Sequence, residues 1–339
     1  MQEKRALITG ITGQDGSYLA ELLLKNGYEV FGLVRDVQKI NLTNIAQIKN
    51  EIRFIEGDIA DPKTIISSIK KSYPSEFYNL AAQSFVAKSW ETPHLAAQIN
   101  ALGVTNILES IRAVKPDTKF YQASSSEMFG KAHSVPQNEN TAFNPRTPYG
   151  WAKLYAHGMT KTYRESYHLF TCNGILFNHE SERRGVEYVT RKITTAVAAI
   201  VKGSQEYVEL GNLSATRDWG HAEDYVMAMY LMLQHETADD YVIATGQTAT
   251  VRDFATKAFA AAGITLRFEG EGLDEVGIED KTGKIRVGIN PKFFRPLDVD
   301  QLIGNPQKAI DILGWNRKIS FDKLIERMVT NDIKLIELG

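Results

Sequence analysis

The chain has 339 residues, a formal net charge of −2 and a single cysteine, Cys172. A charge so close to zero gives no electrostatic reason to expect nucleic acid as a partner, and one cysteine excludes an intrachain disulfide scaffold. Because the chain has no long apolar run, at its N-terminus or elsewhere, we expect a cytoplasmic protein with no membrane partner.

Short apolar runs rich in β-branched and aromatic residues alternate with helical patterns in the first part of the chain. The predicted strands cover residues 5–9, 29–34, 52–57, 76–82, 119–124 and 169–177. Continuously apolar strands that alternate with helices are typical of a parallel sheet buried on both faces. We therefore predict an α/β fold with a doubly wound parallel sheet.

The alternation weakens after about residue 180, and roughly 150 residues per domain suggests two domains. We predict a dinucleotide-binding domain over residues 1–180 and a smaller, substrate-binding α/β domain over residues 181–339. A strand near 241–246 is expected to return to the main sheet. Residues 270–288, rich in glycine and acidic residues, are expected to form a surface excursion, and residues 290–296 an aromatic turn flanked by proline.

Three glycines follow the first predicted strand at three-residue spacing. Gly10, Gly13 and Gly16 lie between that strand and the first helical pattern. Glycine here permits a tight turn and lets backbone N–H groups approach a pyrophosphate, whose charge the helix N-terminus favours. In this context the motif predicts a Rossmann dinucleotide site, and the alternative is a tight turn without a ligand.

Charged residues follow the second and third predicted strands. Arg35 suits the 2′-phosphate of NADP, whereas an acidic residue at this point usually binds the ribose hydroxyl of NAD. Arg35 therefore favours NADP, while Asp36 beside it leaves NAD open, and a solvated charge pair is a further alternative. Asp58 is a candidate adenine contact or a turn aspartate.

Tyr149 and Lys153 lie four residues apart, on one face of a predicted helix. An adjacent ammonium favours a phenolate, so we expect the pKa of Tyr149 to fall. A phenolate beside a nicotinamide removes a hydroxyl proton while hydride leaves the same carbon. Pro148 and Gly150 predict that the helix begins here, and the alternative is a pair of surface residues.

A run of serines and a glutamate, residues 124–127, ends the fifth predicted strand. Ligands of open α/β sheets bind beyond the carboxyl ends of the strands. Ser125 is a candidate hydrogen-bond partner for a sugar hydroxyl, and Glu127 is a candidate general base. The alternative is a turn with a surface glutamate. The seven histidines show no metal-ligand spacing, so we expect no metal.

Together these motifs resemble the extended short-chain dehydrogenase/reductase superfamily and, within it, the GDP-mannose 4,6-dehydratase family. The matching stretches extend over nearly the whole chain. They are residues 8–16, 78–84, 121–130, 145–150, 174–181, 189–193, 210–213, 217–220, 240–246 and 294–296.

The resemblance implies a hydro-lyase that converts GDP-mannose, or a close GDP-sugar, by moving hydride from C4 to C6 with loss of water and recycling of NADP. It implies that Ser125 bonds the 4-hydroxyl, that Tyr149 and Lys153 serve the hydride step, and that Glu127 removes the C5 proton. Ser126 stands where related dehydratases carry the aspartic acid that protonates the leaving hydroxyl. The donor of that proton therefore stays open, with Glu127 a candidate for both roles.

The resemblance also assigns binding residues. The implied cofactor contacts are Gly10, Thr12, Gly13, Gln14, Asp15, Gly16, Arg35, Asp58, Leu80, Ala81, Ala82, Ser84, Tyr149 and Lys153. The implied substrate contacts are Ser84, Ser125, Glu127, Asn178, Val189, Lys192, Leu210, Gly211, Arg217, Arg295 and Asp298.

Three stretches depart from the family pattern. Residues 35–38 read Arg-Asp-Val-Gln where the family has Arg-Arg-Ser-Ser, which leaves NADP against NAD, and homodimer against homotetramer, open. Residues 295–298 end in aspartate where the family has glutamate. Trp151 replaces a smaller residue, and a change near the pocket favours a different sugar such as GDP-manno-heptose.

Three alternatives to a GDP-mannose dehydratase stay open at this point: a GDP-manno-heptose dehydratase, an epimerase or 4-reductase of the same superfamily, and an NADP-sensing binding protein without catalysis. Epimerases and reductases need no base for elimination at C5, so Glu127 discriminates against them. The joint presence of Ser125, Glu127, Tyr149 and Lys153 argues against a protein that has lost its chemistry.

Overall fold

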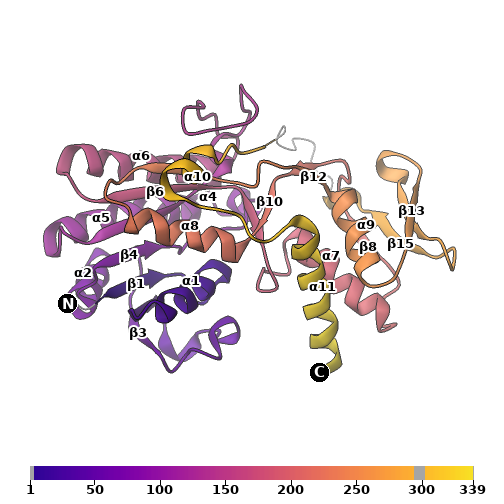
Figure 1. The fold of residues 1–339 in the computed structure, drawn as a ribbon, viewed down its shortest axis with the longest axis horizontal. Helices are drawn as coiled ribbons and strands as arrows, with labels where there is room; N and C mark the ends of the chain where they lie inside the picture. The colour runs from indigo at the N-terminus through magenta and orange to yellow at the C-terminus, as the bar shows by residue number, and fades with distance from the viewer. Residues whose placement is uncertain (1–3, 294–301, 339) are drawn as a thin grey trace.

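The computed structural model describes residues 4–293 and 302–338. Within them, the main sheet has seven parallel strands in the order β11-β6-β5-β4-β1-β2-β3 (Figure 1). The strands are β1 (Arg5–Thr9), β2 (Glu29–Val34), β3 (Ile52–Glu56), β4 (Glu76–Asn79), β5 (Lys119–Ser125), β6 (Thr171–Leu176) and β11 (Asp240–Ile243). The predicted doubly wound parallel sheet is confirmed.

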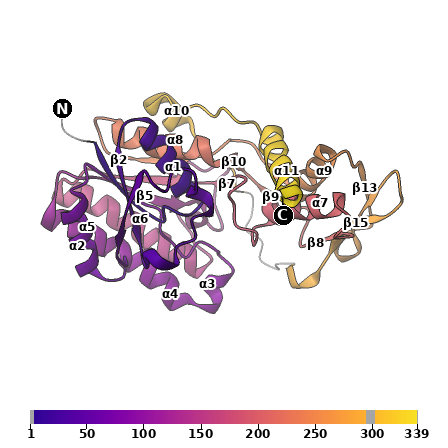
Figure 2. The ribbon, with the colours of Figure 1, turned by 90° about the horizontal axis from the view of Figure 1, so that it is seen from below.

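Helices cover both faces of this sheet (Figure 2). One face carries α1 (Gln14–Lys25), α8 (Ala222–Gln234) and α10 (Gln307–Leu313), and the other carries α2 (Pro62–Ser72), α5 (Gly103–Val114) and α6 (Pro148–Tyr167). Strand β1 shows why its three central residues are all apolar. Ala6 and Ile8 belong to the core under α1 and α8, whereas Leu7 belongs to the core under α2 and α5.

A second, smaller sheet lies beside the first, with the order β13-β14-β15-β8. Its strands are β8 (Val208–Leu210), β13 (Leu266–Glu269), β14 (Val276–Glu279) and β15 (Ile285–Ile289). It packs with α7 (Val189–Val201), α9 (Val251–Ala261) and α11 (Phe321–Leu338) around a separate core, at the right of Figure 1.

Residues 270–288, expected to form a surface excursion, are mostly exposed, but they also contain β14 and most of β15, which the sequence did not predict. In these strands Val and Ile alternate with glycine and charged residues. Gly277 has no side chain and packs directly against Phe268 and Val287, so the segment lacks the apolar run by which a strand is recognised in sequence.

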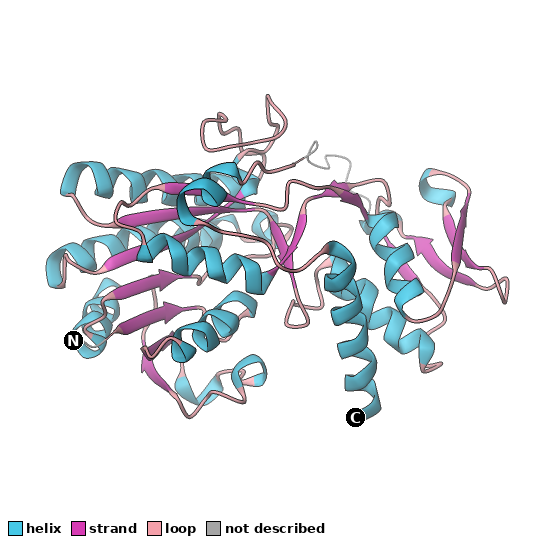
Figure 3. Ribbon diagram, in the orientation of Figure 1, coloured by secondary structure: helices cyan, strands magenta, loops and turns pink. Residues whose placement is uncertain are grey.

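Two short strand pairs lie between the sheets (Figure 3). Strand β7 (Asn178–Glu180) pairs with β10 (Trp219–His221), and β9 (Thr216–Arg217) pairs with β12 (Ala249–Thr250). Because β7 begins two residues after β6 ends, the chain runs directly from the main sheet into the strand pairs between the sheets. Two short helices, α3 (Lys88–Glu91) and α4 (Pro93–Ala97), precede α5. Among the described helices, none combines the length and apolarity needed to cross a membrane.

Candidate active site

A cleft of about 510 Å³ lies between the two sheets. One wall is formed by the carboxyl end of β5, the loop after β4 and the first turns of α6. The other wall is formed by the segment before α7, by α7 itself and by the loop after β8. Ser125, Glu127, Tyr149 and Lys153 all line this cleft, so the structure brings the four predicted catalytic residues together.

Local sequence places Tyr149 and Lys153. The Thr147 hydroxyl caps α6 by accepting a hydrogen bond from the Gly150 N–H at 3.0 Å, and Pro148 occupies the first helical position, where a proline costs no hydrogen bond. Tyr149 therefore stands in the first turn and Lys153 one turn further on. Both are buried, at 8% and 5% exposure.

Burial controls the protonation of this pair. Desolvation raises the pKa of Tyr149 above its usual value, and a hydrogen bond with Ser125 opposes the rise only in part. The Lys153 ammonium lies 5.7 Å from the centre of the Tyr149 ring and donates to the Ala123 carbonyl at 2.8 Å. Burial lowers the pKa of Lys153 to about 8. The expected fall in the Tyr149 pKa is wrong, because desolvation outweighs an ammonium that is already bound by a carbonyl.

The end of β5 positions the serine and the glutamate. The Ser125 hydroxyl accepts a hydrogen bond from the Glu127 N–H at 3.2 Å, which turns the chain sharply after the strand. Since Ser125 also bonds Tyr149, its hydroxyl links the strand end to the start of α6. The half-buried Glu127 follows within the same turn and lines the cleft.

Buried amide side chains fix the carbonyl that holds Lys153. Strand β4 ends opposite Gln122, so the carbonyl of Ala123 is not needed for pairing with β4. Gln122 donates to it at 2.9 Å and accepts from Asn79 at 2.8 Å, and Asn79 accepts from Thr9 at 2.7 Å. This chain of hydrogen bonds connects the residue before the glycine loop to the acceptor of the lysine.

The glycine loop has the geometry that a pyrophosphate needs. Gly10 has φ +69°, and a Cβ there would lie 2.9 Å from the backbone nitrogen of Ala81. A Cβ on Gly16 would lie 2.3 Å from the carbonyl oxygen of Gly10. Gly13 precedes α1 without any side-chain cap, so the first-turn N–H groups of this helix have no competing side chain. The loop therefore fits a dinucleotide.

The helix that follows the loop is tied to the second wall of the cleft. Asp15, in α1, forms an ion pair of 2.8 Å with His179, in β7, and Gln14 donates to the His179 carbonyl at 3.0 Å. Burial opposes ionisation of both groups, but each charge stabilises the other. The pKa of Asp15 is consequently lowered and that of His179 raised.

Replacing His179 by glutamine is expected to lower the free energy of unfolding by about 3 kcal/mol, because it leaves the buried Asp15 carboxylate unpaired. The contribution of the lowered Asp15 pKa is present above the ordinary value of 3.8, and that of the raised His179 pKa below the ordinary value of 6.5. The difference between wild type and variant should therefore be largest between these two values and shrink as pH rises through the raised His179 pKa. Urea unfolding at a series of pH values measures it. The exposed His133 is the control. Its replacement by glutamine should give no loss of unfolding free energy that peaks between these two pH values.

The remaining predicted cofactor residues lie outside the cleft, near the carboxyl ends of β1, β2 and β3. The Thr12 carbonyl accepts from Asn44 at 3.1 Å, and the Asp58 carboxylate accepts from the Ala60 N–H at 2.9 Å. Arg35 is exposed. The Asp36 carboxylate accepts from the Gln38 N–H at 2.9 Å and pairs with Lys39 at 3.0 Å.

Most of the predicted contacts after β4 and in the second wall do line the cleft. They are Leu80, Ala82, Ser84, Asn178, Val189, Lys192, Leu210, Gly211 and Arg217. Arg295 and Asp298 lie outside the described residues.

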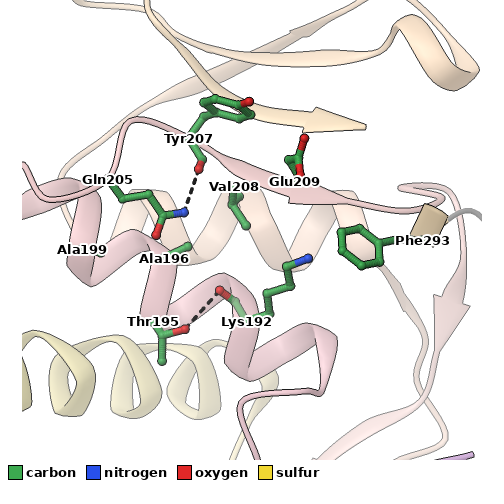
Figure 4. Close-up of a pocket in the computed structure, with 9 residues that line it drawn as sticks. All are labelled: Lys192, Thr195, Ala196, Ala199, Gln205, Tyr207, Val208, Glu209 and Phe293. Carbon is green, nitrogen blue, oxygen red and sulfur yellow. Dashed lines mark hydrogen bonds between the residues drawn. The ribbon is translucent and has the colours of Figure 1, made fainter. Parts of the chain in front are cut away.

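A second hollow of about 580 Å³ adjoins the cleft and shares Lys192 and Phe293 with it. Figure 4 shows the Lys192 side chain reaching toward the Phe293 ring and Glu209. The ammonium lies 3.5 Å from the ring centre. Burial lowers the pKa of Lys192, and Glu209 opposes this. Lys192, a predicted substrate contact, is thus held by an aromatic ring at the boundary of the two hollows.

Sequence reasoning missed several residues that line the cleft, among them His179, Arg184 and Tyr188. Arg184 pairs with the buried Glu180 at 3.0 Å and lies 3.6 Å above the Tyr188 ring. His179 lies in the family motif at residues 174–181, which is a signal in the sequence, whereas nothing in the sequence indicates that Arg184 and Tyr188 enter the cleft.

Trp151 does not approach the cleft. It is 59% exposed, because it follows Tyr149 by two residues and so lies on the opposite side of α6. The inference of a different sugar from this residue is therefore wrong.

Comparison with known proteins agrees with this site. The family model described as GDP-mannose 4,6 dehydratase matches residues 7–328. GDP-mannose 4,6 dehydratase 2 of Caenorhabditis elegans is 49% identical, over 99% of this chain and 91% of the relative. Two solved structures share the fold at low identity. They are a dTDP-glucose 4,6-dehydratase of Bacillus anthracis in complex with NAD (TM-score 0.81, 20% identity, 98% of both chains) and RMD of Pseudomonas aeruginosa complexed with NADPH (TM-score 0.76, 18% identity, 98% and 99%).

Proposed function

Because the chain belongs to the GDP-mannose 4,6-dehydratase family, we propose that its cleft converts GDP-mannose into GDP-4-keto-6-deoxymannose with NADP as the resident cofactor. The chain is an enzyme, a hydro-lyase. The observation that carries the proposal is the convergence of Ser125, Glu127, Tyr149 and Lys153 on one cleft beside a loop that fits a dinucleotide.

The four residues have different roles in the proposed reaction. Ser125 and Tyr149 bond the 4-hydroxyl, and the deprotonated Tyr149 accepts its proton. Burial disfavours this phenolate, and the Lys153 ammonium, 5.7 Å from the Tyr149 ring centre, acts against that cost. The glycine loop would hold the dinucleotide, whose nicotinamide would supply a hydride acceptor for C4 and a hydride donor for C6. The resulting 4-ketone acidifies the C5 proton, which Glu127 removes as the C6 hydroxyl leaves. With Ser126 unsuited as an acid, Glu127 passes this proton to the leaving hydroxyl.

The reaction is tested by incubating the purified protein with GDP-mannose and NADP⁺ and weighing the sugar nucleotide by mass spectrometry. Loss of one water with no net reduced cofactor supports the proposal. Unchanged GDP-mannose contradicts it.

The preference for NADP rests on residues 35 and 36. The Asp36 carboxylate is engaged by Gln38 and Lys39, which leaves the exposed Arg35 as the charge available to a ribose substituent. Replacing Arg35 by alanine should weaken NADP⁺ binding by about tenfold, since a charge-assisted hydrogen bond to phosphate contributes about 1.5–3 kcal/mol. Isothermal titration with NADP⁺ and NAD⁺ measures it, and an equal loss for both cofactors would contradict the assignment.

The enzyme is further proposed to be a homodimer formed through an apolar surface on α3, α4, α6 and the short helical segment Gln98–Leu102 before α5. The exposed residues of this surface are Trp90, Leu95, Leu102, Trp151 and Tyr155. Aromatic side chains gathered on a surface are typical of an interface.

Replacing Trp151 by glutamate should shift the protein to monomers at micromolar concentration, because it places a charge within this surface. Light scattering after gel filtration measures the mass. A Trp151→Glu variant that stays dimeric would mean that the interface lies elsewhere. The control is Tyr73→Glu, at an exposed residue outside this surface, which should leave the mass unchanged.

A further inference from the structure

One side chain joins the two walls of the cleft. Tyr188 precedes α7, and its hydroxyl bonds the Ser84 hydroxyl at 3.0 Å, in the loop after β4. The edge of its ring meets Phe85, with ring centres 5.7 Å apart, and the Arg184 guanidinium covers the ring face at 3.6 Å. All four residues line the cleft, so the contact joins its two walls.

Both ends of this contact are anchored. On one side Arg184 pairs with Glu180, a carboxylate only 2% exposed that also accepts from Thr190 at 2.6 Å. On the other side the backbone of Gln83 exchanges two hydrogen bonds, of 2.8 and 3.0 Å, with the buried amide of Asn100. Each wall is thus fixed by its own contacts. The hydrogen bond between the Tyr188 and Ser84 hydroxyls joins these two fixed walls.

A hydrogen bond that keeps the two walls together matters during the proposed reaction. After oxidation at C4 and loss of water, the sugar is an unsaturated ketone that has lost its 4- and 6-hydroxyl contacts, and its two electrons remain on the nicotinamide. If this ketone leaves before hydride returns to C6, the enzyme is left with reduced cofactor and cannot oxidise the next substrate.

We propose that Tyr188 is a positioning residue whose bond to Ser84 holds the cleft closed between the two hydride transfers, so that the unsaturated ketone is reduced before it can leave. This inference rests on the proposed dehydratase function. It concerns retention of the intermediate, and neither bond making nor bond breaking is assigned to Tyr188.

Tyr188→Phe removes the hydroxyl and keeps the ring contacts with Phe85 and Arg184. One hydrogen bond changes the open population about two- to tenfold, so release of the ketone relative to its reduction should rise by that factor. The variant should start at the wild-type rate and then slow, with reduced-nicotinamide absorbance growing toward one equivalent per site. Mass spectrometry should find the unsaturated ketone free in solution. Tyr167→Phe, an exposed tyrosine at the end of the same helix as Tyr149, is the control.

Two measurements distinguish loss of the Tyr188–Ser84 hydrogen bond from a general weakening of the fold. Tyr188→Phe should add nothing to the ketone release of a Ser84→Ala variant, because both changes break the same bond. Amide hydrogen exchange of the cofactor-free protein should quicken in residues 84–88 and 185–189 only. Sustained turnover of Tyr188→Phe without reduced cofactor would overturn the proposal. A wild-type protein that removes no water from GDP-mannose would instead overturn the proposed function.

Discussion

Glu127→Gln is expected to slow the loss of water from GDP-mannose by ~10²–10⁴-fold, because an amide cannot accept the C5 proton. The substitution keeps the volume of the side chain and leaves Ser125, Tyr149 and Lys153 in place. Oxidation at C4 should therefore continue. We expect reduced-nicotinamide absorbance to appear on mixing with GDP-mannose while mass spectrometry shows no dehydrated sugar.

The matched control is Glu165→Gln on the same protein. Glu165 lies on the exposed side of α6 and pairs only loosely with Lys161, at 3.8 Å. Its replacement should leave the rate within about twofold, as expected for a surface ion pair. Normal water loss by Glu127→Gln would mean that another group removes the C5 proton, and the assignment of this glutamate would fail.

Tyr149→Phe is expected to slow the reaction by a similar ~10²–10⁴-fold but at an earlier step. Without the hydroxyl nothing accepts the proton of the 4-hydroxyl, so hydride does not leave C4. No reduced-nicotinamide absorbance should appear, in contrast to Glu127→Gln. Stopped-flow absorbance on mixing the loaded enzyme with GDP-mannose measures the difference between the two variants.

The control for this variant is a tyrosine of α6 that the cleft does not contain. Tyr167→Phe removes a hydroxyl from an exposed ring at the other end of the helix and should leave the absorbance change unaltered. If Tyr149→Phe still reduced the cofactor at the wild-type rate, the proton acceptor for the 4-hydroxyl would have to be another residue of the cleft.

Local sequence already determined a large part of this protein. The apolar strands, the three glycines after β1 and the position of Pro148 act within a few residues of chain, where turn geometry and side-chain periodicity suffice. They predicted the parallel sheet, the tight loop that fits a dinucleotide and the start of α6. The placement of Ser125 and Glu127 followed as well, because ligands of such sheets lie at the carboxyl ends of strands.

Tertiary structure alone decided the rest. The pair of Asp15 with His179 joins residues 164 positions apart, and the bond of Tyr188 to Ser84 joins residues 104 apart. No local sequence pattern encodes these contacts between distant residues, since they depend on how the second sheet packs beside the first. The protonation of Tyr149 has the same origin, because its pKa is set by how completely the surrounding chain excludes water, and a neighbouring lysine in sequence does not reveal that.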